Sequence, residues 1–116
     1  MTLQDLQTYC LKKPGVTEEL PFGPTTLVFK VMNKMFALTG LDDFKSINLK
    51  CDPDLAIELR ESFPEVQPGY HMSKKHWNTV TVNGGVTDDQ IYQLVDDSYN
   101  LIVASLPKKL RLELEN

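Results

Sequence analysis

The sequence predicts a single α+β domain in which helices cover one face of an antiparallel β-sheet. Residues 46–50 and 77–82 alternate between apolar and polar side chains, which is the pattern of half-buried strands. Residues 3–12, 53–63 and 88–106 carry apolar side chains at helical spacing. A length of 116 residues, 41% of them hydrophobic, suits one domain with its own core.

The first helix is expected to begin after Thr2, which can serve as its N-cap. Pro14 and Gly15 end it, because proline does not continue a helix and glycine favours the turn that follows. Residues 16–25 contain two prolines and a glycine, which predict an irregular loop.

Three strands follow in the predicted order. Residues 27–31 are rich in β-branched and aromatic side chains, and residues 35–38 are expected to return antiparallel to them. Asn33-Lys34 between them is typical of a tight turn. Residues 46–50 form the third strand. Short connections of this kind indicate antiparallel pairing.

The second half of the chain adds two helices and one strand. Asp52 and Pro53 open the second helix as N-cap and first helical residue. Residues 66–76 are predicted to be a loop with a short edge strand at most, and residues 77–82 form a strand. The complete order is αβββαβα.

The last helix has the clearest signals. Thr87 followed by Gln90 forms a capping box. Small residues suggest close packing at three positions, namely Ser98, Ala104 and Ser105, and Pro107 with a basic tail ends the helix. Its apolar stripe consists of Ile91, Leu94, Val95, Leu101 and Ile102.

Charge is distributed unevenly along the chain. The net charge of −4 argues against a protein that coats nucleic acid by bulk charge. Residues 52–65 and 83–106 are strongly acidic, whereas residues 66–82 contain two lysines, both histidines and no acid. A local basic patch is therefore possible on an acidic protein.

Residues 68–77 are the one cluster that suggests binding chemistry. Lysines can contact phosphate, aromatic rings can stack on bases, and a protonated histidine can donate to an anion. A structural interpretation competes with this one. In it, Trp77 covers the sheet, Tyr70 lies on the core, and Lys74 and Lys75 belong to a solvated turn.

Other site chemistries find no support in the sequence. There is no glycine-rich phosphate loop, and His71 and His76 lack the partners of a zinc site. Cys10 and Cys51 are expected to be reduced thiols, with Cys51 buried at the end of a strand. We therefore expect no cofactor, no metal and no enzymatic activity.

The N-terminus lacks the basic start and apolar core of a signal peptide, and no apolar run approaches the length of a membrane span. We expect a cytoplasmic protein that does not contact membranes. A monomer is the default expectation, since nothing in the sequence specifies an oligomer.

Four stretches together resemble the signatures of the MmcQ/YjbR family: residues 14–24, 49–53, 68–77 and 104–109. The resemblance covers essentially the whole chain. It implies a bacterial cytoplasmic protein with a frataxin-like (CyaY-like) fold, and DNA binding through a double-wing arrangement of hairpins. Frataxin-like iron binding is not implied, because the first helix lacks an acidic ridge.

The leading hypothesis is a non-enzymatic DNA-binding protein that uses residues 70–77 and the sheet face away from the helices. That open face is expected to show Lys50, Asn48, Trp77, Thr79 and Thr81. The predicted nucleic-acid-binding residues are Lys50, Tyr70, His71, Lys74, Lys75, His76 and Trp77. Lysines and His76 would contact phosphate, and the two aromatic residues would stack or wedge. The wings would be the Asn33-Lys34 hairpin and the loop before Trp77.

Two alternatives remain open. The first is a small-anion or nucleotide-binding module that uses Phe22, Lys50, His71 and His76. The second is a protein-interaction module. Salt dependence separates them, because binding to a phosphate backbone weakens steeply as salt rises.

Overall fold

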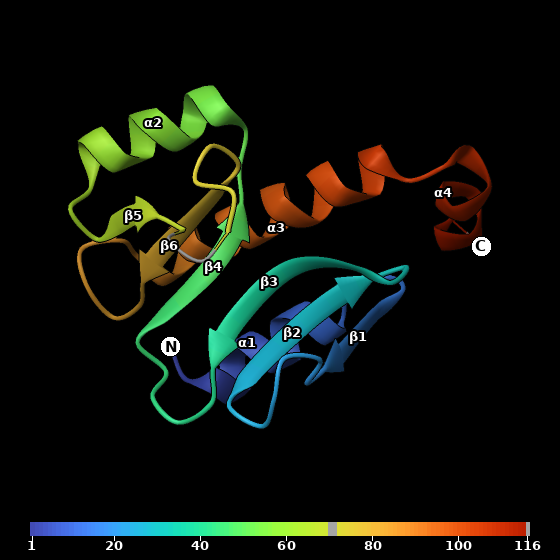
Figure 1. The fold of residues 1–116 in the computed structure, drawn as a ribbon, viewed down its shortest axis with the longest axis horizontal. Helices are drawn as coiled ribbons and strands as arrows, with labels where there is room; N and C mark the ends of the chain where they lie inside the picture. The colour runs from blue at the N-terminus through green and yellow to red at the C-terminus, as the bar shows by residue number, and fades with distance from the viewer. Residues whose placement is uncertain (70–71, 116) are drawn as a thin grey trace.

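The computed structural model describes residues 1–69 and 72–115. Its elements, in chain order, are α1 (Leu3–Leu11), β1 (Val16–Glu19), β2 (Thr26–Val31), β3 (Lys34–Gly40), β4 (Ser46–Lys50), α2 (Pro53–Ser62), β5 (Val66–Pro68), β6 (Trp77–Thr81), α3 (Asp88–Ser105) and α4 (Lys108–Leu114). The strands form one six-stranded sheet in the order β1-β2-β3-β4-β6-β5, antiparallel throughout (Figure 1).

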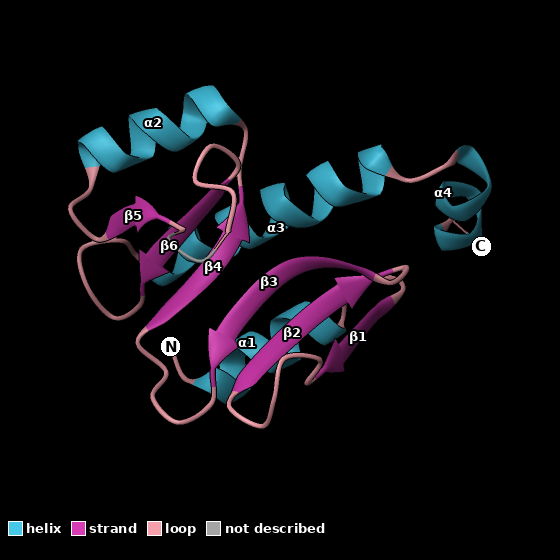
Figure 2. Ribbon diagram, viewed as in Figure 1, coloured by secondary structure: helices cyan, strands magenta, loops and turns pink. Residues whose placement is uncertain are grey.

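The predicted α+β fold is confirmed, with an antiparallel sheet whose helices pack on one face. Figure 2 shows α1 and α3 behind the sheet, with α2 beyond the β5 edge. Side chains from all three helices join one core with the sheet, among them Leu6 of α1, Leu59 of α2 and Ile91 of α3. The opposite face carries no helix among the described residues.

Two elements, β1 and α4, were not predicted, whereas the short edge strand allowed for within residues 66–76 is present. Residues 16–19, expected to be loop, form edge strand β1, because they pair with β2 and Val16 packs against the core. Residues 66–68 form the short edge strand β5. The basic tail forms helix α4 after Pro107, and its Leu114 also reaches the core.

The β2–β3 hairpin turns one residue earlier than expected. Met32 and Asn33 adopt positive φ of 47° and 71°, as the two central residues of a type I′ turn do, and Lys34 already belongs to β3. A bulge follows, because Phe29 pairs with Ala37 and the next residue, Lys30, pairs with Met35. Phe36 and Ala37 are consequently both buried against the helices.

Helix α3 is fastened to this bulge by Ser98, which is completely buried. The Ser98 hydroxyl donates to the carbonyl oxygen of Phe36 at 2.6 Å and accepts from the backbone N–H of Lys50 at 2.9 Å. The expected close packing at Ser98 is thus confirmed. The same expectation is wrong for Ala104 and Ser105, which are exposed because α3 extends there beyond the sheet.

Two further α3 positions depart from the predicted stripe. Leu101 is exposed, whereas Tyr99, absent from the stripe, is buried. The Tyr99 ring meets Phe36 edge-on at 5.5 Å, and its hydroxyl donates to the carbonyl oxygen of Pro14 at 2.6 Å. An aromatic side chain with a polar tip can be buried when that tip finds a partner.

Replacing Ser98 by alanine is expected to lower the free energy of unfolding by about 1–3 kcal/mol for each backbone group left unpaired. Denaturant titration measures this value. The matched control is Ser105→Ala on the same helix. Ser105 is exposed and its hydroxyl bonds within its own helix, to Ile102, so a change within about 0.5 kcal/mol is expected. Equal effects of the two substitutions would contradict the role given to Ser98.

Cys10 and Cys51 are free thiols and both are buried, which confirms the prediction that they form no disulfide with each other. Burial raises the pKa of Cys10 to about 12 and that of Cys51 to about 11. A thiol that stays protonated is a poor nucleophile.

Both cysteines are therefore expected to resist a thiol reagent such as Ellman's reagent at neutral pH, and to react fully in denaturant. Because folding raises the pKa of both thiols, the unfolded chain loses its thiol protons first as the pH rises. The thiol contribution to stability is therefore complete below the pKa of the unfolded chain, and the free energy of unfolding should fall above about pH 9. Rapid native labelling of Cys10 would contradict its placement in the core.

Candidate functional site

The face of the sheet away from the helices is built from strand residues that alternate with core residues. Asn48 pairs with Thr79, and Lys50 pairs with Trp77. With Ser46 opposite Thr81 in the same ladder, the predicted set Lys50, Asn48, Trp77, Thr79 and Thr81 shares this open face. The period-2 interpretation of residues 46–50 and 77–82 is confirmed.

Trp77 is the centre of a small apolar cluster on the open face. It packs with Val28 and Leu38, and Met35 and Met72 lie against them. Only 8% of Trp77 is exposed, so its ring covers the sheet instead of presenting a free surface for stacking. The burial of Trp77 fits the structural interpretation, and its stacking on bases stays a prediction.

A groove lies beside this cluster, with a volume of about 490 Å³. That volume is within the usual range of small-ligand sites. Leu38 and Met35 come from β3, Phe22 from the loop before β2, and Met72 and Ser73 from the segment before β6. The lining residues in the described part of the chain are Phe22, Thr26, Met35, Leu38, Thr39, Gly40, Asn48, Met72 and Ser73.

The polar groups of the groove differ in availability. The Thr39 hydroxyl is already used, since it donates to the carbonyl oxygen of Ser46 at 2.8 Å. Asn48 Oδ1 accepts from the Thr79 hydroxyl, which orients the amide. Asn48 Nδ2 then remains as a donor that has no partner among residues 1–69 and 72–115. The groove thus combines apolar side chains with the hydroxyls of Thr26 and Ser73 and with an amide donor that is oriented by its own hydrogen bond.

The loop that carries Lys74, Lys75 and His76 is a defined structure. The backbone N–H groups of His76 and Trp77 both donate to the carbonyl oxygen of Ser73, at 3.1 and 2.9 Å. On its far side, the carbonyl oxygen of His76 accepts from the N–H of Cys51 at 2.7 Å. These bonds fix the backbone from which the lysines project.

Arg60 of α2 holds this loop from behind. Its Nε donates to Asn78 Oδ1 at 2.7 Å, and its Nη2 donates to the carbonyl oxygens of Trp77, at 3.3 Å, and Lys74. Sequence reasoning did not identify Arg60 as part of the site. The available signal was its position as the one cation in the acidic stretch 52–65.

The predicted site residues are distributed as follows. Lys50 is half-buried on the sheet, Lys74 and Lys75 are exposed on the loop, and His76 is half-buried beside them. Tyr70 and His71 lie outside the described residues. Of the alternative anion site, Phe22 lines the groove, whereas Lys50 and His76 are not part of its lining.

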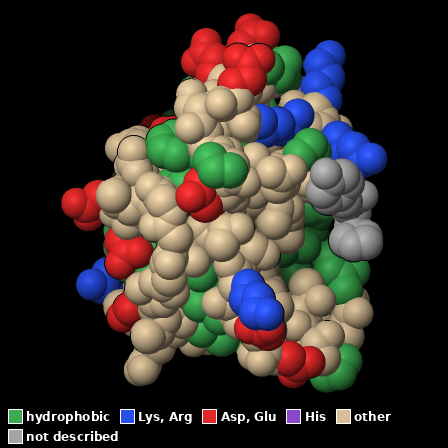
Figure 3. Space-filling view, turned by 90° about the vertical axis from the view of Figure 1, so that its left-hand side faces the viewer, with side chains coloured by type: hydrophobic (Ala, Val, Ile, Leu, Met, Phe, Trp, Pro, Cys, Tyr) green, Lys and Arg blue, Asp and Glu red, His purple; other side chains and the backbone are tan. Residues whose placement is uncertain are grey.

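The strand rows of the open face carry more lysines than acids, although the whole protein is acidic. The charged side chains on its strand rows are Glu19, Lys30 and Lys50, and Glu19 pairs with Lys30 at 3.3 Å. Because Glu19 and Lys30 form an ion pair, the remaining positive charge of this region comes from Lys50 and the neighbouring loop lysines. In Figure 3, Lys and Arg side chains gather at the upper right while acidic side chains gather at the top.

The described part of the chain contains neither a candidate metal site nor a candidate membrane-spanning helix. No three His, Cys, Asp or Glu side chains there come together as a metal site. Among the same residues, no helix has the length and apolar character to cross a membrane.

Fold and site together define a class: small α+β domains in which helices cover one face of an antiparallel sheet and the other face holds a groove. The model of the YjbR family matches residues 11–101. The chain belongs to the YjbR family. Its relatives include the uncharacterized protein YjbR of Escherichia coli, 37% identical over 96% of this chain and 95% of that protein.

A second Escherichia coli protein and two solved structures are also similar to this chain. The uncharacterized protein YbdF of Escherichia coli is 39% identical over 85% of this chain and 82% of its own. The crystal structure of a Deinococcus radiodurans protein with a DUF419 domain has a TM-score of 0.92 and 40% identity, covering 98% of this chain and 88% of that one. A Pseudomonas syringae protein reaches a TM-score of 0.73 at 33% identity, over 87% and 98% of the two chains. These two solved proteins therefore share the fold of this chain.

Replacing Arg60 by alanine is expected to free the loop before Trp77. Trp77 is the one tryptophan of the chain, so its emission reports on this region alone. We expect a shift of the emission to longer wavelength and faster quenching by iodide, because water reaches the ring. Arg60→Lys should restore little, since an ammonium group lacks the fork of donors that contacts several oxygens.

The control is Arg111→Ala, at an exposed arginine of α4 whose side chain has no hydrogen-bond partner among residues 1–69 and 72–115. Its emission should match the parent protein. Unchanged emission in Arg60→Ala would show that the loop does not depend on Arg60.

Proposed function

We propose that this protein is a non-enzymatic nucleic-acid-binding protein that binds weakly through the open face of its sheet. The observation that carries the proposal is the local excess of lysines on that face in a protein of net charge −4. Phosphate contacts by such lysines position a nucleic acid without reading its sequence.

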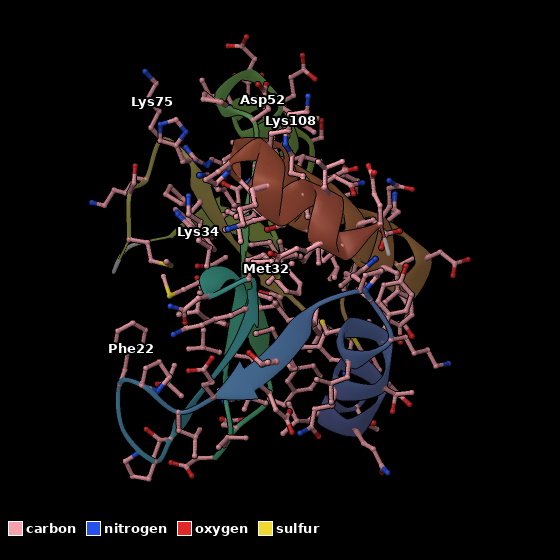
Figure 4. All side chains as sticks on the ribbon, turned by 90° about the vertical axis from the view of Figure 1, so that its right-hand side faces the viewer. Phe22, Met32, Lys34, Asp52, Lys75 and Lys108 are labelled. Carbon is pink, nitrogen blue, oxygen red and sulfur yellow. The ribbon has the colours of Figure 1, made fainter. Side chains whose placement is uncertain are left out.

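The arrangement of the lysines supports this proposal. Lys34 lies at the tip of the β2–β3 hairpin, and Lys75 lies on the loop before β6. Figure 4 shows Lys34, Lys75 and Phe22 along the same side of the molecule, opposite α1. The hairpin and the loop thus flank the open face, an arrangement that supports the proposal of two wings.

The acidic remainder of the protein limits the strength of binding. Screening at physiological salt confines the attraction to charges within about 8 Å. We therefore expect dissociation constants in the non-specific range of about 10⁻⁴ to 10⁻⁶ M at physiological salt. No catalytic step is part of the proposal.

Removing either flanking lysine is expected to flatten the salt dependence of binding. Fluorescence anisotropy with labelled oligonucleotides, at several salt concentrations, gives the slope of log K against log salt. Lys34→Ala and Lys75→Ala should each reduce that slope by about 1, because each removes about one phosphate contact.

The charge-matched control is Lys12→Ala, at the end of α1 on the helical side of the sheet. Its slope should equal that of the parent protein. Absence of binding at low salt, with protein above about 10⁻⁴ M, would refute nucleic-acid binding, since even non-specific binding falls in that range.

A further inference from the structure

We infer that the groove on the open face receives an unpaired base, so that the nucleic acid is bound as a single strand. This inference rests on the proposed function and names the form of nucleic acid that the same face takes. Its starting point is that, among residues 1–69 and 72–115, no charged residue lines the groove, whereas lysines lie outside it. A neutral groove beside cations suits a ligand with a neutral flat part and an anionic backbone.

The residues that line the groove can contact the flat base of the proposed ligand. Phe22 is 64% exposed and projects from the loop before β2, so its ring is available to a partner (Figure 4). Met35, Leu38 and Met72 supply the remaining apolar surface. Bases stack on aromatic rings without regard to sequence, because every base has a π-face. Phe22 is therefore the stacking residue of the groove.

The side-chain amide of Asn48 favours an unpaired base as the ligand. Asn48 Nδ2 is held in place by the bond between its own Oδ1 and the Thr79 hydroxyl. A donor in this position can bond to the carbonyl or ring-nitrogen acceptor at the edge of a base. In a duplex, the Watson–Crick edges are occupied by the partner strand, and unpaired bases can be splayed into protein pockets.

The backbone of such a ligand would leave the groove toward the lysines. Lys75 follows Ser73, a groove residue, by two positions on the same loop, and Lys34 lies at the tip of the hairpin whose strand β3 contributes Met35 to the groove. A phosphate attached to a base in the groove would lie on the side of the molecule along which Figure 4 shows Lys34 and Lys75. Charge complementarity and the neutral groove together favour a nucleotide over an apolar peptide.

The test uses three labelled probes of equal length: a thymidine oligonucleotide, the same backbone with abasic sites, and a duplex. Anisotropy at low salt should show the thymidine strand bound at least about tenfold more tightly than either other probe. Phe22→Ala should remove this preference and leave the salt slope intact. Leu20→Ala is the matched control, because Leu20 is a neighbouring exposed apolar residue, 49% exposed, outside the groove lining.

The possible outcomes separate the two proposals. Equal binding of the thymidine and abasic strands, or a preference that survives Phe22→Ala, overturns the base-binding groove while phosphate binding stands. Tighter binding of the duplex also overturns it. Failure of all three probes to bind at low salt refutes the proposed function and this inference together. A preference that is lost in Phe22→Ala and retained in Leu20→Ala supports the inference.

Discussion

The buried hydroxyl of Ser98 connects the helical layer to the sheet at the point where β3 is irregular. The bulge at Phe36 leaves a carbonyl group that the β4 ladder does not use, and Ser98 supplies its donor while accepting from Lys50. A buried backbone group without a partner is costly, so this position requires a small side chain with a hydroxyl. The bulge also turns Met35 to the open face, where it lines the groove.

The open face is thus arranged by elements that lie behind it or at its edge. Helix α3 fixes β3 against β4 through Ser98, and α2 fixes the loop before β6 through Arg60. The loop in turn places Met72 over Trp77. The hydrogen bonds of Ser98 and Arg60, made behind the sheet and at its edge, therefore determine which side chains reach solvent on the open face.

Local patterns in the sequence were sufficient for most of the fold. Period-2 alternation identified β4 and β6 and assigned their faces, and the capping signals located the starts of all three long helices. Strand β1 and helix α4 were missed because pairing with β2 and contact with the core stabilise them, and neither appears in local propensity. The site was harder, since the groove joins Phe22, Asn48 and Met72 from distant segments and Trp77 serves packing.

The central claim is that nucleic acid meets the open face and no other surface. Backbone chemical-shift mapping by NMR, during titration with a single-stranded oligonucleotide, tests it most directly. Shifts are expected to concentrate in β3, β4 and the loop before β6, including Asn48 and Ser73, with α1 unaffected. Shifts concentrated on α1 and the solvent side of α3, or none at all at saturating oligonucleotide, would contradict it.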